Sequence, residues 1–119
     1  MQRRRAVITG GGGYVGHRLG AALAGQGYDV LLLDVTPPPP DAPLPLHIVF
    51  AACDVRNAAA LKSFFKQADI VFHVASYGMS GCSQLDVEQV EAVNVGGTKA
   101  VICACLECGV PRLVYTSTW

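Results

Sequence analysis

Charged side chains are scarce in this chain of 119 residues. They make up 15% of the sequence, whereas an average soluble domain carries about 25%. The 9 Lys and Arg residues balance the 9 Asp and Glu residues, so the formal net charge is zero. Without a basic surplus, nothing predicts a nucleic acid as a partner. We interpret the basic cluster Arg3–Arg5 as a solvated lead-in to a strand, in preference to a phosphate-binding or targeting arm.

Long apolar runs are also lacking. No stretch reaches the roughly 18 consecutive apolar residues of a membrane-spanning helix. The first apolar run, Ala6–Thr9, is too short for a signal-peptide core and is followed at once by glycines. We therefore expect this chain to be intracellular and cytoplasmic.

The sequence has no second cysteine pair that could complete a zinc site. Five cysteines, an odd number without a signal peptide, indicate reduced thiols. Cys105 and Cys108 form a C-x-x-C pattern, but a zinc site needs two further ligands at a matching spacing. Because both lie in an apolar helical stretch, we predict buried or half-buried thiols and no metal.

Apolar residues, at 51% of the chain, are arranged in short runs that alternate with helical patterns. β-Branched and leucine-rich runs predict five strands, and apolar residues at spacings of three and four predict three helices. The strands are Arg5–Thr9, Asp29–Asp34, His47–Ala51, Asp69–Ala75 and Arg112–Ser117; the helices are Tyr14–Gln26, Ala58–Gln67 and Asp86–Cys108. Continuously apolar strands alternating with helices predict an α/β fold, a Rossmann-type doubly wound parallel sheet with strand order 3-2-1-4-5.

A glycine-rich turn follows the first strand and opens the first helix. Gly10, Gly13 and Gly16 give the pattern G-x-x-G-x-x-G. In a dinucleotide site the first glycine permits a tight turn, the second lets the backbone approach a pyrophosphate, and the third lets the helix pack closely. The free N–H groups and positive dipole end of the helix then face the phosphates. No Gly-Lys-Ser/Thr follows the glycines, which excludes a P-loop.

Asp34 ends the second strand. A carboxylate at this place accepts hydrogen bonds from the ribose hydroxyls of NAD and repels the 2′-phosphate of NADP. No arginine follows Asp34 until Arg56. The sequence therefore favours NAD as the cofactor. The alternatives are a structural turn with an unrelated acid, or a site for a flavin or a mononucleotide.

The motifs together resemble the extended short-chain dehydrogenases/reductases. The resemblance rests on the glycine turn, on the acid that ends the second strand, and on four further stretches in matching order: Asp54–Arg56, Val71–Ala75, Asn94–Thr98 and Leu113–Thr118. Within that group, residues 75–81 and 110–118 are most similar to the 3-beta-hydroxysteroid dehydrogenase branch, and family 42E of the short-chain dehydrogenases/reductases is the most similar family.

The resemblance implies a role for each matching residue. The hydroxyl of Thr118 takes the place of the catalytic Ser or Thr that hydrogen-bonds the reacting oxygen of the substrate. Cofactor contacts are implied for Gly10, Gly13, Tyr14, Val15, Gly16, Asp34, Asp54, Val55, Val74, Ala75, Ser76, Asn94 and Ser117. The implied reaction is NAD-dependent oxidation or reduction of a hydroxyl or ketone in a small molecule, with a 3-beta-hydroxysteroid as the substrate. Members of this branch often carry membrane-anchoring segments.

Several of these residues also have purely structural interpretations. His73 lies within an apolar strand, where a packed or hydrogen-bonded histidine is the expected state. Asp54 could cap the helix that follows it. Residues 76–83 could form an ordinary surface loop, or Tyr77 and Met79 could line a substrate entrance.

The general acid/base of the family is absent from this sequence. Its members use a tyrosine with a lysine four residues later, where the lysine lowers the pKa of the tyrosine. Tyr14, Tyr28, Tyr77 and Tyr115 are followed at that spacing by Arg18, Leu32, Gly81 and Trp119. We therefore expect residues 1–119 to be the N-terminal part of an NAD-binding domain, truncated after strand five and without a substrate domain. The alternatives are an NAD-dependent sugar-nucleotide epimerase or dehydratase, and a non-catalytic nucleotide-binding fragment.

Overall fold

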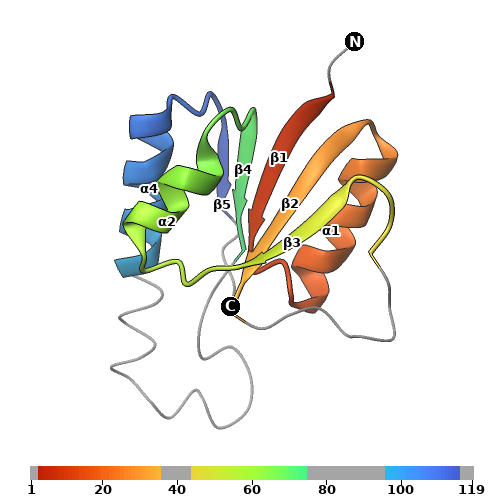
Figure 1. Ribbon diagram of the computed structural model, residues 1–119, viewed down its shortest axis with the longest axis horizontal. Helices are drawn as coiled ribbons and strands as arrows, with labels where there is room; N and C mark the ends of the chain where they lie inside the picture. The colour runs from red at the N-terminus through yellow and green to blue at the C-terminus, as the bar shows by residue number, and fades with distance from the viewer. Residues whose placement is uncertain (1–2, 36–43, 75–95, 116–119) are drawn as a thin grey trace, which may run out of the picture.

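The computed structural model describes residues 3–35, 44–74 and 96–115 and shows a five-stranded sheet between two layers of helix (Figure 1). The strands are β1 (Arg4–Thr9), β2 (Tyr28–Asp34), β3 (Ile48–Ala52), β4 (Ile70–His73) and β5 (Leu113–Tyr115). The helices are α1 (Tyr14–Gly25), α2 (Ala58–Phe65) and α4 (Gly97–Cys108).

All neighbouring strands of the sheet are parallel, and their order is β3-β2-β1-β4-β5. This confirms the predicted fold class and strand order. β1 lies at the centre, where the last residue, Thr9, is in register with Leu33 of β2 and with His73 of β4. The order of the strands reverses between β1 and β4, and an open parallel sheet binds ligands at such a switch point.

Each face of the sheet has its own apolar core, because successive strand residues point to opposite faces. On one face Ile8 and Leu32 pack with Leu19 and Leu23 of α1. On the other face Val7, Leu33 and Val71 pack with α2 and α4, through Leu61, Phe65, Val101 and Ala104. The strands are continuously apolar because both faces are covered.

Several helix ends differ from the predicted boundaries. α2 ends at Phe65, two residues early, because Lys66 leaves the helical conformation and Gln67 has a φ of 64°. Asn57 caps the start of α2, where its side chain accepts a hydrogen bond from the Ala60 amide at 3.1 Å. The interpretation of Asp54 as that cap was therefore wrong. The part of the last predicted helix before Gly96 lies outside the described residues.

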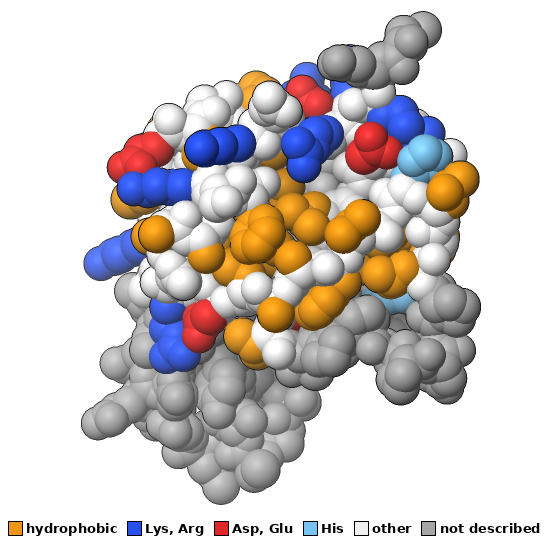
Figure 2. Space-filling model, viewed as in Figure 1, with side chains coloured by type: hydrophobic (Ala, Val, Ile, Leu, Met, Phe, Trp, Pro, Cys, Tyr) orange, Lys and Arg blue, Asp and Glu red, His pale blue; other side chains and the backbone are white. Residues whose placement is uncertain are grey.

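Two regions of the sheet are not covered within the described ranges. All three residues of β5, an edge strand there, are exposed. Val49 of β3 is 62% exposed. On the face drawn in Figure 2, hydrophobic side chains gather between α2 and β3. In residues 3–35, 44–74 and 96–115, no helix combines the length and the apolar character that a membrane span requires.

Candidate cofactor site

The residues expected at a cofactor site gather at the carboxyl edge of the sheet. The glycine turn follows β1, Asp34 ends β2, Asp54 and Val55 follow β3, and Val74 follows β4. Because the strands are parallel, these four chain segments leave the sheet at the same edge. The fold therefore brings together residues that lie up to 64 positions apart, as from Gly10 to Val74.

The glycine turn is fixed to the neighbouring strand by backbone hydrogen bonds. The amides of Gly10 and Gly11 both donate to the carbonyl oxygen of Leu33, at 2.7 and 3.0 Å. Gly10 has a φ of 77°, a conformation that side chains other than glycine rarely adopt. This agrees with the tight turn predicted for the first glycine.

Close packing accounts for two more glycines of the turn. A Cβ atom on Gly16 would overlap the carbonyl of Gly10 and lie 2.9 Å from the Cα atom of Gly11. A Cβ atom on Gly11 would lie 2.8 Å from the Cα atom of Leu32. The third glycine of the motif thus packs against the turn itself. Among the glycines of α1 it is Gly20 that lies against the strands, since a Cβ atom there would lie 2.9 Å from Cδ2 of Leu32. The sequence reasoning missed Gly11, since its constraint comes from the neighbouring strand.

Gly13 is different, because nothing within the described residues demands a glycine there. Its φ of −85° suits any residue, and a Cβ atom would meet only the Gly10 carbonyl oxygen, at an ordinary 3.5 Å. Gly13 is the N-cap of α1, makes no side-chain cap bond, and is followed by a first turn without acidic residues. The N–H groups of this helix end and its positive dipole are thus available to an anion. Because Gly13 has no side chain, the backbone at the N-terminus of α1 can be approached closely, which fits a pyrophosphate.

Asp34 is joined to the glycine turn. The amide of Gly12 donates to its carboxylate oxygen Oδ2 at 3.0 Å. The carboxylate is only partly buried. It therefore lies beside the turn with part of its surface open, where a ribose could reach it. The turn residue Gly12 was not among the predicted site residues.

The two predicted site residues that follow β3 differ in exposure, since Val55 is buried and Asp54 is only partly buried. Val55 is 7% exposed, and its Cγ2 atom lies where a Cβ of Gly97 would be, at the start of α4. Asp54 accepts hydrogen bonds from the Arg56 amide at 2.9 Å and from its guanidinium at 2.6 Å. That hydrogen bonding lowers the pKa of the Asp54 carboxyl below its usual value. In this structure both residues have partners within the chain.

A buried polar network lies under the end of β4. The Nδ1 atom of His73 is 2.7 Å from the hydroxyl oxygen of Thr9, and its Nε2 atom is 3.1 Å from that of Thr98. The amide of Val74 donates to the same Thr9 hydroxyl at 3.2 Å. His73 is 1% exposed, and burial lowers its pKa to about 4. The prediction of a packed, hydrogen-bonded histidine is confirmed.

Five of the predicted site residues lie outside the described residues. They are Ala75, Ser76, Asn94, Ser117 and Thr118. The same holds for Tyr77 and Met79, which were considered for a substrate entrance. Of Tyr14 only the backbone is described, at the first position of α1; Val15 next to it is 57% exposed.

The thiols of the C-x-x-C pair are buried and half-buried, as predicted. Cys105 is buried and Cys108 is of intermediate exposure. Burial, with a contribution from Cys108, raises the pKa of the Cys105 thiol to about 11, so the thiol is protonated and unreactive at neutral pH. Among the described residues, no three His, Cys, Asp or Glu side chains come together as a metal site would need.

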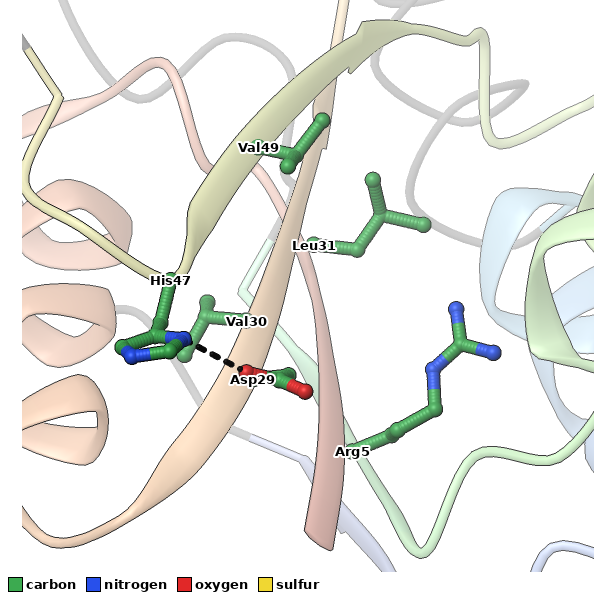
Figure 3. A pocket seen from close by; sticks show the side chains of 6 residues that line it. All are labelled: Arg5, Asp29, Val30, Leu31, His47 and Val49. Carbon is green, nitrogen blue, oxygen red and sulfur yellow. Dashed lines mark ion pairs between the residues drawn. The ribbon is translucent and has the colours of Figure 1, made fainter. Parts of the chain in front are cut away.

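A surface hollow lies at the opposite, amino edge of the sheet. Its lining includes Arg5 of β1, Asp29 of β2 and Val49 of β3 (Figure 3). Figure 3 also shows the ion pair between His47 and Asp29, whose Nδ1 and Oδ1 atoms are 3.0 Å apart. The strands that line it, β1, β2 and β3, run from this end toward the edge that holds the glycine turn, so the hollow is not part of the candidate site.

Comparison with known proteins agrees with this geometry. The sequence model of the 3-beta hydroxysteroid dehydrogenase/isomerase family matches residues 7–119. Short-chain dehydrogenase/reductase family 42E member 1 of Mus musculus is 54% identical over 116 residues, which are 95% of this chain and 29% of the mouse protein. The chain thus spans less than a third of the length of this curated relative.

Solved structures show the same fold. An epimerase from Methanothermobacter thermautotrophicus is 31% identical, with a TM-score of 0.86 over 98% of this chain and 36% of that one. The Bordetella bronchiseptica enzyme WbmG, solved in complex with NAD, is 27% identical, with a TM-score of 0.81 over 96% of this chain and 37% of that one. These findings confirm the resemblance drawn from the motifs. The chain belongs to the 3-beta hydroxysteroid dehydrogenase/isomerase family.

Proposed function

We propose that this chain is the N-terminal part of a dinucleotide-binding domain and binds NAD(H) for an oxidoreductase. The observation that carries the proposal is the bare glycine turn at the switch point of the sheet, with the Asp34 carboxylate beside it. Gly13 and the first amides of α1 would hold the pyrophosphate, and Asp34 would hold the adenosine ribose.

NAD is preferred to NADP on electrostatic grounds. A 2′-phosphate on the ribose would bring its negative charge close to Asp34. Arg56, the first arginine after Asp34, has its guanidinium on the Asp54 carboxylate, so a 2′-phosphate would compete with Asp54 for it. Both features favour the unphosphorylated ribose.

The reaction we propose for the full-length protein is hydride transfer between NAD(H) and a hydroxyl or ketone carbon, with a 3-beta-hydroxysteroid as substrate. When bound, NAD would accept the hydride. Thr118 would hydrogen-bond the substrate oxygen. None of the four tyrosines has a lysine four positions later, so in this proposal residues 1–119 bind and orient the cofactor but do not supply the general acid/base.

Calorimetric titration of the chain with NAD and with NADP tests the proposal. We expect NAD to bind at least ten times more tightly than NADP. Asp34→Asn should weaken NAD binding several-fold and remove most of the discrimination, because it removes the charge and keeps the shape of the side chain. Asp29→Asn is the matched control, since it neutralises a carboxylate on the same strand at the opposite edge.

Two results would contradict the proposal. The first is folded chain, judged by circular dichroism, that binds neither nucleotide. The second is an equal loss of NAD affinity in the Asp34 and Asp29 variants, because the position of the carboxylate relative to the turn would then be irrelevant.

A sugar-nucleotide epimerase is the second candidate for the full-length protein, because the structural relative at 31% identity is an epimerase. The two candidates differ in the products that the full-length protein forms. Net reduction of NAD by a 3-beta-hydroxysteroid supports the dehydrogenase. Interconversion of UDP-sugar epimers without net reduction of NAD supports the epimerase.

A further inference from the structure

We propose that His73 is a positioning residue of the cofactor site, which ties the glycine turn to helix α4 through Thr9 and Thr98. This inference rests on the proposed NAD-binding function. It assigns a role to a buried imidazole that the sequence predicted only as packed or hydrogen-bonded.

The position of His73 is the first argument. His73 is the last residue of β4, and its Nδ1 partner Thr9 is the last residue of β1. These two strands flank the switch point of the sheet. The Thr9–His73 contact therefore lies directly beneath the place where a dinucleotide would cross the carboxyl edge.

The partners of His73 are the second argument. Thr9 directly precedes Gly10, the residue whose left-handed conformation begins the turn. Thr98 is the second residue of α4 and follows the expected cofactor residue Asn94 by four positions in the sequence. The imidazole is thus a bridge of two hydrogen bonds, 2.7 and 3.1 Å long, between the strand that leads into the glycine turn and the start of α4.

The third argument is the burial of the bridge. Thr9 is fully buried and His73 almost so, and the ring of Tyr115 from β5 lies with its centroid 5.5 Å from that of His73. A space-filling aromatic or aliphatic residue would pack here at lower cost than a polar ring, which must keep both nitrogens hydrogen-bonded. A histidine at this position is explained if its two hydrogen bonds hold Thr9 and Thr98 at a separation that the cofactor site needs.

The expected effect is uneven along the cofactor. The adenosine side of the turn has its own supports, since Gly10 and Gly11 are held by Leu33 and Gly12 is held by Asp34. The side beyond the switch point depends on β4 and α4, which the His73 bridge joins. Loss of the bridge should therefore weaken contacts to the nicotinamide half of NAD and spare those to the adenosine diphosphate half.

The test compares the binding of NAD and of ADP to the chain by calorimetry. In His73→Phe, which keeps an aromatic ring beside Tyr115, we expect NAD affinity to fall at least tenfold and ADP affinity to change less than twofold. His73→Asn can restore a polar atom near Nδ1, and His73→Gln one near Nε2. Both should bind NAD more tightly than His73→Phe.

A purely space-filling role predicts the reverse order, with Phe most similar to the wild-type chain, and that result would overturn the inference. Equal losses for NAD and ADP would also overturn it. Wild-type chain that binds neither ligand would instead refute the proposed function on which the inference rests.

Should His73→Phe prove unfolded by circular dichroism, the fallback variant is Thr98→Val, which removes the hydroxyl opposite Nε2 at a half-buried position. Unchanged NAD affinity in that variant would then overturn the bridge.

Discussion

Two carboxylates on the same strand, β2, are used in opposite ways. Asp29, at the amino end, accepts contacts from the side chains of Arg3 and His47, each at 3.0 Å. Asp34, at the carboxyl end, accepts a hydrogen bond from a backbone amide of the glycine turn. The first carboxylate contacts side chains near the surface, whereas the second accepts a hydrogen bond that orders the glycine turn. We therefore expect the amino edge to contribute surface contacts alone and the carboxyl edge to hold the turn on which the proposed cofactor binding depends.

Steric constraint is also uneven between the edges. The carboxyl edge contains backbone contacts too close for any Cβ atom, as at Gly11 and Gly16. The amino edge contains side-chain ion pairs and an open hollow. Substitutions of Gly11 and Gly16 should therefore be costly, and those at the amino edge should be tolerated.

The largest effect is expected from Gly16→Ala. Its methyl group would overlap the Gly10 carbonyl, which is fixed backbone and cannot rotate away. We expect the free energy of unfolding to fall by more than about 3 kcal/mol, at the upper end of overpacking costs, as measured by urea denaturation. The matched control is Gly13→Ala, where a Cβ has room and the change in stability should stay below about 1 kcal/mol. Equal losses in the two variants would contradict the packing described for Gly16.

The next effect is a pH dependence that comes from His73. Burial lowers its pKa from 6.5 to about 4 in the folded chain, so between these values the unfolded chain binds a proton that the folded chain does not. The associated stability is complete above pH 6.5 and is lost as the pH falls toward 4. It amounts to up to about 3 kcal/mol at 1.36 kcal/mol per unit.

This contribution is measured as a difference between two proteins. Urea denaturation of the wild-type chain and of His73→Phe between pH 7 and pH 4 cancels the titration of the carboxyl groups that both share. We expect the stability of the wild-type chain to fall more steeply over this range. Parallel curves would show that His73 is protonated as easily in the folded chain as in the unfolded one.

The smallest effect is expected from Asp29→Asn. Its side chain is 48% exposed and that of its partner Arg3 is 31% exposed, and solvent-exposed ion pairs contribute about 0–1 kcal/mol. We expect a loss of less than about 1 kcal/mol in urea denaturation, reduced further at high salt. A loss comparable to that of Gly16→Ala would mean that the amino edge is as constrained as the carboxyl edge.

The sequence predicted the fold because its signals are local and repeated. Apolar strands, helical spacings and the turn at Gly10 each reflect the conformation of adjacent residues, and the strand order followed from general rules of topology. Exact helix ends were missed where single residues decide them. Gln67, for example, adopts a positive φ that its residue type does not demand.

The sequence predicted site residues only where they belong to a recognisable motif, the glycine-rich turn and the acid that ends the second strand. Asp34 and the motif glycines could be chosen from their spacing. Thr9, Gly11 and Thr98 could not, because their roles arise from neighbours in other strands or helices that the sequence does not identify. His73 was expected to be buried and hydrogen-bonded, but its two partners are defined only by the packed sheet.

Val55, just after β3, packs closely against Gly97, the first residue of α4. A Cβ atom on Gly97 would lie 2.6 Å from the Cγ2 atom of Val55. The side chain of Val55 therefore occupies the space that a side chain at residue 97 would need. A side chain at residue 97 therefore requires Val55 to shift or to be replaced by a smaller residue, so we expect the effects of substitutions at the two positions to be non-additive.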